Sequence, residues 1–369
     1  MNLPPFKLER YFAKHEFNTE FLLCSSDCEA MSIADLLAME TGAAEKFQQT
    51  WLGYTESQGH PALRKEIAKI YETIQPEEIL VHTGAEEAIF LFMLAALKEN
   101  DHIIVHAPHY QSLSEIAKGM GCMVSHWRAR EENNWALDLD ELRHLMRSST
   151  KAIVINTPHN PTGYLMSKPD FEAVNKFAQE NNLLLFCDEV YRESEYDLSL
   201  RLPAGADMGE HAVSLGVTSK TYGLAGLRIG WIATKNKTFH EKMAGLKDYT
   251  TICNSAPSEF LAEVALRNRQ KLIARNVGII KSNLEIVDDL FTRHSNLFKW
   301  VRPTAGSMGF PKLLKGSTED FCDDLVKQAG VLLLPGSAYD DSKNHFRIGL
   351  GRKNLPQAVE RLDEFLSKN

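Results

Sequence analysis

Short apolar runs alternate with longer helical patterns along the chain from about residue 79 onward. Each run is apolar over its whole length rather than at every second position, which is typical of strands buried on both faces of a parallel sheet. The pattern therefore predicts an α/β fold with a seven-stranded, mostly parallel sheet covered by helices. The predicted strands are Ile79–His82, Ile103–His106, Val124–Trp127, Ala152–Asn156, Leu183–Cys187, Ala212–Val217 and Ile229–Ala233.

The two ends of the chain have different patterns. Short helices are predicted before the first strand, over residues 33–39 and 62–71, and a single long helix is predicted after the last strand, over residues 258–292. The remaining tail predicts short strands near 331–334 and 346–348 and a helix from Pro356. We expect three segments: residues 1–40 in a smaller α+β domain, residues 41–265 in the large domain, and residues 266–369 forming the interdomain helix and the rest of the smaller domain.

Composition and charge are those of an ordinary globular protein. Of the 369 residues, 44% are hydrophobic and 24% are charged. The net charge of −8, with scattered Lys and Arg, argues against a nucleic-acid or anionic-membrane surface. The N-terminus has no signal-peptide pattern, and the longest strongly apolar run, Ala88–Leu97, is too short to cross a bilayer. We therefore expect a cytoplasmic protein.

Cysteine and histidine spacing gives no metal or disulfide pattern. The six cysteines form no CxxC pair, so reduced thiols are expected. His102, His106 and His109 lie close in sequence, but an extended strand directs His109 to the face opposite the other two. No metal site is expected.

Lys220 lies in the segment with the most specific pattern. A lysine in a dry pocket loses its proton and then acts as a nucleophile that forms a Schiff base. Ser219 before it and Arg228 eight residues after it are suitable donors to a phosphate. The Ser-Lys-Thr text is not a P-loop, because Ser214 and Ser219 occupy the positions where that loop needs glycine.

Residues that suit a phosphorylated planar ligand follow other predicted strands. Gly84 and Ala85 come between a strand and a buried helix, whose free N-terminal amides attract a phosphate. Tyr110 follows the next strand, where its ring suits stacking on a planar ligand.

Polar side chains end two further strands. Asn160 follows one strand in an Asn-Pro turn, and Asp188 ends the next with Tyr191 three residues on. A buried Asp188 needs a cationic partner, and a protonated pyridine nitrogen is such a partner. Ligands of open α/β sheets bind at the carboxyl ends of strands, where all these residues are predicted to lie.

The order and spacing of these residues resemble the fold-type I enzymes that use pyridoxal 5'-phosphate (PLP), in the aminotransferase class I and II family. The resemblance extends from about Tyr54 to Arg347. It implies the PLP-dependent transferase fold, with Lys220 forming the internal aldimine and moving the proton during catalysis. It also implies the positions of the other cofactor ligands: Asp188 at the pyridine nitrogen, Asn160 and Tyr191 at the ring hydroxyl, Tyr110 at the ring face, and Gly84, Ala85, Glu86, Ser219 and Arg228 around the phosphate.

The same resemblance implies further partners. Tyr54 matches the family tyrosine that reaches the phosphate in the neighbouring subunit, which implies a homodimer with shared active sites. Arg347 matches the arginine that binds the α-carboxylate of the substrate, a role for which a planar guanidinium is suited. Val217 replaces a frequent serine or threonine phosphate ligand, so Thr218 or the backbone is expected to serve instead.

The first functional hypothesis is an aminotransferase that moves an amino group between an amino acid and a 2-oxo acid. A second keeps PLP and changes the reaction, because the text around Lys220 also resembles the branch that contains capreomycidine synthase, which cyclises a hydroxyarginine. In that case Asp27, with Glu29, is expected to bind a cationic side chain. Carbon–sulfur β-lyase chemistry is open on the same scaffold. A non-catalytic regulator of this fold is disfavoured, because Lys220 and Asp188 are both present.

Overall fold

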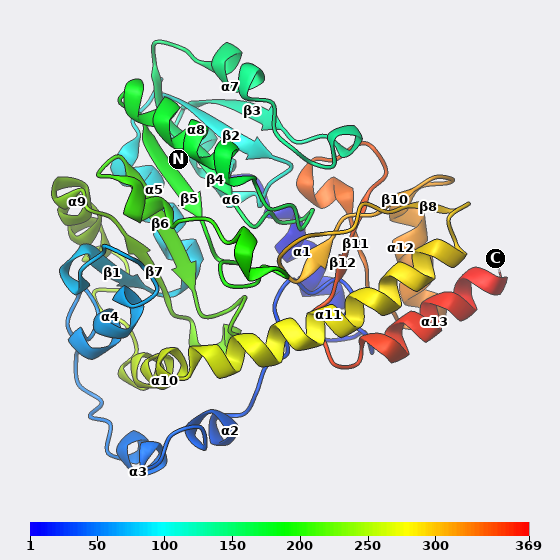
Figure 1. The fold of residues 1–369 in the computed structure, drawn as a ribbon, viewed down its shortest axis with the longest axis horizontal. Helices are drawn as coiled ribbons and strands as arrows, with labels where there is room; N and C mark the ends of the chain where they lie inside the picture. Colours follow the sequence, from blue (N-terminus) through cyan, green and yellow to red (C-terminus); the bar gives the residue numbers. More distant parts are fainter. Residues whose placement is uncertain (369) are drawn as a thin grey trace.

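The computed structural model describes residues 1–368. A seven-stranded sheet forms its centre, and all seven predicted strands are present (Figure 1). The sheet therefore confirms the predicted α/β class. The strands are β1 Ile79–His82, β2 His102–Ala107, β3 Met123–Arg128, β4 Thr150–Asn156, β5 Leu184–Asp188, β6 Ala212–Val217 and β7 Gly230–Ala233.

The strand order is β1-β7-β6-β5-β4-β2-β3. Strands β2 to β6 pair in parallel, whereas β7 runs antiparallel to both of its neighbours, β1 and β6. The sheet is therefore mostly parallel, and β1 points in the same direction as β2 to β6. The carboxyl ends of these strands consequently lie at one edge of the sheet, where α/β folds bind ligands.

Helices cover both faces of this sheet. Residues of β2 alternate between the two faces, since Ile103 and Val105 pack in the cluster that contains α5, α6 and α9, and Ile104 packs with α7 and α8. Near β1 and β7, α4 and α10 cover the second face. The bounds are α4 Pro61–Ala68, α5 Gly84–Ala96, α6 Ser112–Gly119, α7 Leu139–Leu145, α8 Lys168–Glu180, α9 Lys237–Lys247 and α10 Ala256–Arg267.

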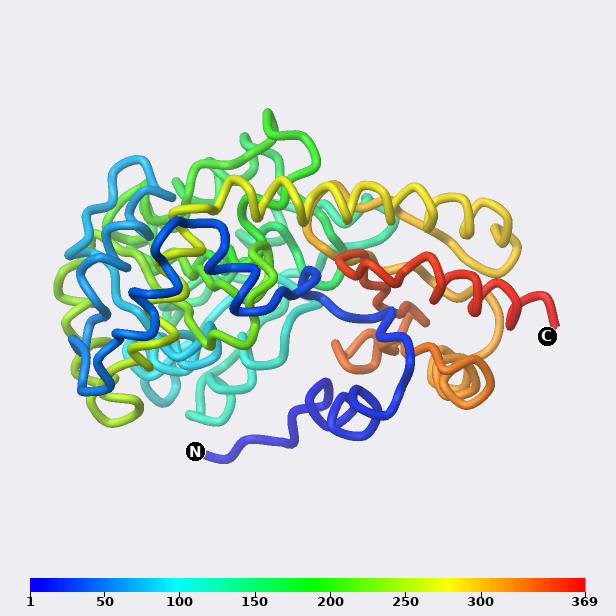
Figure 2. Tube along the Cα trace, turned by 90° about the horizontal axis from the view of Figure 1, so that it is seen from below, coloured from blue at the N-terminus to red at the C-terminus, as the bar shows by residue number. Residues whose placement is uncertain are grey.

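A second, smaller core forms from both ends of the chain. The long helix α11 runs from the large sheet to this part and packs there beside α13 (Figures 1 and 2). Phe21 forms a parallel bridge with Val331, which joins the N-terminal segment to this part. The elements are α1 Lys7–His15, α11 Arg269–Arg293, β8 Phe298–Lys299, β9 Met308–Gly309, β10 Lys312–Leu313, α12 Thr318–Ala329, β11 Leu334–Pro335, β12 Phe346–Gly349 and α13 Leu355–Lys368.

The short elements complete the fold. Helices α2 and α3 lie on the outside of the large part, beside α10 (Figure 1). The domain boundaries at residues 40 and 265 stay a prediction. The remaining bounds are α2 Ile33–Leu37, α3 Ala43–Gln48, and the 3₁₀ helices Pro76–Glu78, Glu131–Asn133, Leu198–Leu200, Gly205–Met208, Ala225–Leu227 and Gly336–Tyr339.

The prediction of one continuous helix over 258–292 is wrong at a single residue. Asn268 separates α10 from α11, and its side-chain amide donates to the carbonyl of Val264 at 3.0 Å. Asparagine disfavours helix interiors because its side chain bonds nearby backbone groups. A local hydrogen bond therefore divides the predicted helix. Among residues 1–368, no helix is both long and apolar enough to cross a membrane.

Candidate active site

The antiparallel strand β7 brings two important turns together. Its first residue, Gly230, pairs with His82 at the end of β1 and with Val217 at the end of β6. The turn that begins at Gly84 and the segment that contains Lys220 therefore start side by side. A side chain at position 230 is excluded, because its Cβ would lie 2.6 Å from the carbonyl carbon of Gly84.

Gly84 and Arg228 form a cradle at the start of α5. Gly84 has a left-handed φ of 78°, and a Cβ there would lie 2.6 Å from Nη2 of Arg228. Only glycine allows the guanidinium to approach this closely. The first amides of α5, from Gly84 to Glu86, have no partner within the helix. The turn thus combines free backbone donors with a cation, which suits a phosphate.

One cavity of about 430 Å³ lies at this edge of the sheet. Most of the predicted site residues line it, although they come from both parts of the fold. Gly84 is not on the wall of this cavity, but it directly precedes Ala85, which is. The predicted residues on its wall are Asp27, Ala85, Glu86, Tyr110, Asn160, Asp188, Tyr191, Ser219, Lys220, Arg228 and Arg347.

Lys220 extends into the cavity with little polar support. Its Nζ donates to Oγ of Ser26 at 3.0 Å and lies 5.9 Å from the centre of the Tyr191 ring. Burial lowers the pKa of Lys220, because a desolvated ammonium ion is unfavourable; the field of Asp27 opposes this effect. The environment therefore favours the neutral amine, which is the nucleophilic form.

Asp188 is a buried carboxyl group that makes no ion pair with any residue of the described chain, although the field of Lys220 reaches it. It is 5% exposed, and its Oδ1 accepts from the backbone amide of Val190 at 3.2 Å. Burial raises the pKa of Asp188 to about 7. A cation that enters the cavity would stabilise the ionised form of this group.

Arg347 is a buried cation whose partners in the described chain are all neutral. It is 1% exposed and donates to the carbonyl of Cys24 at 2.9 Å, to Oδ1 of Asn160 at 3.3 Å and to the hydroxyl of Tyr339. Tyr339 in turn donates to Oδ1 of Asn160 at 3.0 Å. The side-chain oxygen of Asn160 is thereby occupied, which leaves its amide nitrogen as a donor for a ligand.

The N-terminal segment contributes a wall that the sequence did not reveal. Ser26 contacts Lys220, α1 adds Glu9 and Phe12 to the cavity, and Glu16 adds its side chain directly after this helix. The amphipathic pattern of residues 7–15 indicates a helix, but nothing in it shows where that helix docks. The position of α1 at the cavity therefore depends on tertiary packing and not on its local sequence.

Three predicted residues have environments that limit their roles. Asp27 lines the cavity, but its carboxylate binds Nη2 of Arg352 at 2.9 and 3.0 Å. Thr218 does not provide the expected hydroxyl, because it donates to the carbonyl of Ile229 at 3.0 Å inside the loop. Tyr54 lies outside the cavity and is 83% exposed.

Comparison with known proteins identifies the class of enzyme that this fold and site define. The sequence profile of the family "Aminotransferase class I and II" matches residues 20–362. The protein belongs to this family.

Relatives and solved structures agree with this assignment. An aspartate aminotransferase from Bacillus sp. (strain YM-2) is 26% identical over 88% of this chain and 86% of its own length. Capreomycidine synthase from Streptomyces vinaceus is also 26% identical, over 99% of this chain and 94% of its own.

A PLP-dependent aminotransferase from Streptococcus suis has a TM-score of 0.94 and 32% identity, covering 100% of this chain and 99% of its own. The PLP-dependent cyclase OrfR has a TM-score of 0.90 and 28% identity, covering 100% of this chain and 98% of its own.

The cofactor of this protein is PLP. The residues present fit it, since Arg228 and the free amides at the start of α5 suit a phosphate and the buried Asp188 makes no ion pair among residues 1–368. The predicted family and cofactor are therefore confirmed.

The raised pKa of Asp188 leads to a test on protein from which PLP has been removed. The folded pKa of about 7 exceeds the unfolded value of ~3.9, so this group lowers stability as pH rises from about 4 to about 7. Asp188→Asn removes that ionisation. At pH 8 the PLP-free variant should unfold at a higher temperature than PLP-free wild type, and the difference should vanish near pH 4.

Thermal unfolding followed by circular dichroism between pH 4 and 8 measures this difference. Asp324→Asn, on the exposed surface of α12, is the matched control and should follow wild type. A constant difference between Asp188→Asn and wild type over the whole pH range would contradict the assignment of a raised pKa to Asp188.

Proposed function

We propose that the protein is an aminotransferase that moves an amino group between an amino acid and a 2-oxo acid. The observation that carries the proposal is the set of charges in one cavity, where Lys220, Asp188, Arg228 and Arg347 all lie on the wall. When bound, PLP supplies a ring that accepts the electron pair released at the substrate's α-carbon. The side chains and backbone of the protein hold PLP and the substrate and move protons during the reaction.

Asp188 and its neighbours orient the ring. The carboxylate of Asp188 pairs with the pyridine nitrogen, which removes the unfavourable burial of an isolated charge. Asn160 donates from its amide nitrogen, and Tyr191 donates from its hydroxyl, to the ring oxygen. Tyr110 covers the ring face, and its own hydroxyl is held by Glu9 at 3.1 Å.

The phosphate is held at the start of α5. Arg228 supplies the positive charge, and Ser219 with the amides of Gly84 and Ala85 supplies neutral donors. Glu86 acts through its backbone amide, because its carboxyl group accepts from Ser112 at 3.2 Å and burial raises its pKa to about 7. The raised pKa limits the negative charge that the phosphate meets.

Lys220 and Arg347 act on the substrate. Lys220 would hold the cofactor through its amine and would accept the proton from the substrate's α-carbon. Arg347 binds the α-carboxylate, which provides the anion that this buried guanidinium lacks among residues 1–368. The cofactor thereby provides an opposite charge for Asp188, and the substrate provides one for Arg347.

The first test is a half-reaction with single amino acids and no 2-oxo acid. The wild-type cofactor spectrum should convert fully to that of pyridoxamine phosphate, with one equivalent of 2-oxo acid released for each site. Lys220→Ala should convert at least ~1000-fold more slowly, because the group that moves the proton is gone. Lys176→Ala, an exposed lysine on α8, should behave as wild type.

The products of the half-reaction decide between transamination and other chemistry. Release of ammonia, a thiol or a cyclised product, with the original spectrum restored, would contradict the aminotransferase proposal. Such an outcome would leave the cofactor site intact and support the lyase or cyclase alternative.

A second candidate function is a reaction of an amino acid with a cationic side chain, such as cyclisation. The similarity to capreomycidine synthase and OrfR supports it, as does the acidic wall formed by Glu9 and Glu16 on the N-terminal segment. Burial, and then the carboxylates of Asp27 and Glu9, raise the pKa of Glu16. Since Arg352 already pairs with Asp27, a substrate cation is best placed to interact with Glu9 and Glu16.

Substituting Glu16 tests this substrate preference. Glu16→Gln should lower kcat/KM for arginine-like substrates about fivefold, which corresponds to ~1 kcal/mol for a partly exposed charge pair. The value for alanine should not change. Steady-state kinetics with both substrates, and with Glu20→Gln as the control outside the cavity, measure the effect. An equal loss for both substrates would contradict a cationic-side-chain pocket.

The homodimer with shared sites is proposed on the basis of an exposed apolar surface. Trp51, Leu52 and Tyr54 are 77%, 80% and 83% exposed, and Tyr249 and Ile252 are 91% and 52% exposed. The hydroxyl of Thr55 donates to the carbonyl of Asn254 at 3.3 Å, so the two loops are adjacent. Exposed apolar side chains on two adjacent loops are typical of an interface, and in the proposed dimer Tyr54 would reach the partner's phosphate.

Charge at the centre of this surface should prevent association. Leu52→Glu should sediment as a monomer and retain PLP less tightly than wild type, because Tyr54 no longer reaches a neighbouring site. Leu198→Glu, at a 68% exposed position on another loop, should change neither property. Wild-type protein that is monomeric with full PLP content would contradict the proposal.

A further inference from the structure

The two chain segments that contain Tyr191 and Lys220 are linked to each other by the residues that directly follow these two in the sequence. Tyr191 is followed by Arg192 and Glu193, and Lys220 is followed by Thr221 and Tyr222. The hydroxyl of Thr221 donates to the carbonyl of Arg192 at 2.9 Å, and the hydroxyl of Tyr222 donates to Oε2 of Glu193 at 2.8 Å. Side chains of neighbouring residues therefore join the turn after β5 to the segment after β6.

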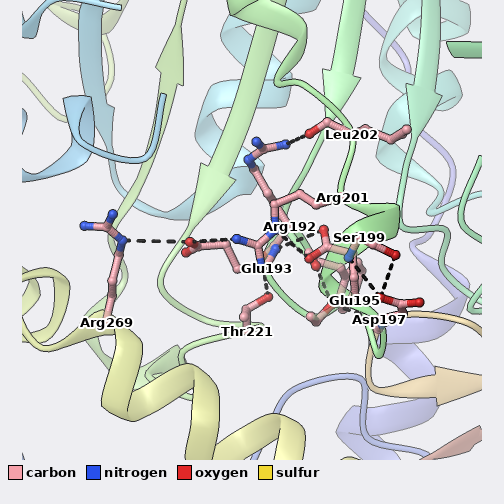
Figure 3. Close-up of polar contacts among 12 residues, drawn as sticks. Arg192, Glu193, Glu195, Asp197, Ser199, Arg201, Leu202, Thr221 and Arg269 are labelled. Carbon is pink, nitrogen blue, oxygen red and sulfur yellow. Dashed lines mark hydrogen bonds and ion pairs between the residues drawn. The ribbon is translucent and has the colours of Figure 1, made fainter. Parts of the chain in front are cut away.

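The other carboxylate oxygen of Glu193, Oε1, lies near two arginines from other parts of the chain. Oε1 lies 3.5 Å from Nη1 of Arg201 and 3.8 Å from Nε of Arg269, the first residue of α11 (Figure 3). Thr221 is also tied to α11, because its carbonyl accepts from the side chain of Asn276 at 2.8 Å. The long helix thus supports both segments.

Glu193 is buried and adopts an unfavourable backbone conformation. It is 4% exposed and has a φ of 70°, in the left-handed region that costs a non-glycine residue about 1 kcal/mol. A buried carboxylate in this conformation needs several strong contacts to compensate. Its interactions with Tyr222, Arg201 and Arg269 meet that need.

We propose that Glu193 is a positioning residue that fixes Lys220 relative to Tyr191 and therefore relative to the cofactor. Glu193 does not line the cavity, so it acts through Tyr222 and Thr221 rather than on the substrate. The inference rests on the proposed role of Lys220. It concerns the position of that lysine and holds for any reaction that Lys220 performs.

The test compares holoenzymes that carry Glu193→Gln or Tyr222→Phe with wild type. Both variants remove or weaken the same link, so both should change the induced circular dichroism of bound PLP in the resting enzyme, with unchanged PLP content. With the best amino donor, kcat should fall about tenfold, or ~1.4 kcal/mol, and KM should stay within about twofold. The double variant should show little more than one single effect.

Glu195→Gln is the matched control for loss of a buried carboxylate. Glu195 is 2% exposed and binds Nε of Arg201 at 2.9 Å. Its Oε1 accepts from the backbone amide of Glu193 at 3.2 Å, a bond that the side-chain oxygen of Gln keeps, and it makes no hydrogen bond to residues 219–222 in the described chain. This variant should lower the unfolding temperature as Glu193→Gln does. Its circular dichroism in the cofactor band and its kcat should stay as in wild type.

Two outcomes would overturn the proposal. One is an unchanged cofactor dichroism and kcat in Tyr222→Phe, the conservative variant that keeps every charge. The other is an equal change in Glu195→Gln, which would show a general effect of lost stability. Because the dichroism is recorded without substrate, neither outcome depends on whether the enzyme is an aminotransferase. A wild-type protein that binds no PLP would instead refute the proposed function.

Discussion

Buried charge that forms no ion pair among residues 1–368 is the constraint on which the active site depends. Asp188 and Arg347 are nearly inaccessible to water, and their described hydrogen-bond partners are neutral groups. Such burial is unfavourable in an isolated protein, and a ligand that brings a pyridinium and a carboxylate relieves it. Burial lowers the pKa of Lys220 and raises the pKa of Asp188. Burial in one cavity thus shifts both groups toward their uncharged forms before PLP and an amino acid bind.

The fold brings these charges together through two long-range arrangements. The antiparallel strand β7 places Gly230 between the ends of β1 and β6, and so sets the phosphate turn beside the segment of Lys220. The small part of the fold then supplies Arg347, 187 residues from the Asn160 that it contacts. Helix α11 spans the two parts, and Glu193, which lies beside Arg269 at the start of this helix, links it to the reactive segments (Figures 1 and 3).

The sequence predicted what depends on local pattern. Continuous apolar runs identified all seven strands, and the rule that parallel strands present their carboxyl ends at one edge placed Asp188, Asn160 and Lys220 in one site. Tyr339, Ser26 and the acidic wall of α1 were not predicted, because their positions follow from packing between distant segments. The break at Asn268 was missed since hydrophobic periodicity continues through it.

Borohydride reduction of the holoenzyme, followed by peptide mapping with mass spectrometry, tests the central claim most directly. Reduction converts the bond between PLP and the lysine that holds it into a stable amine, so the modified residue can be located. The account predicts one PLP for each chain, attached to Lys220 in the peptide between β6 and β7. Attachment to a different lysine, or no attachment in protein that contains PLP, would contradict it.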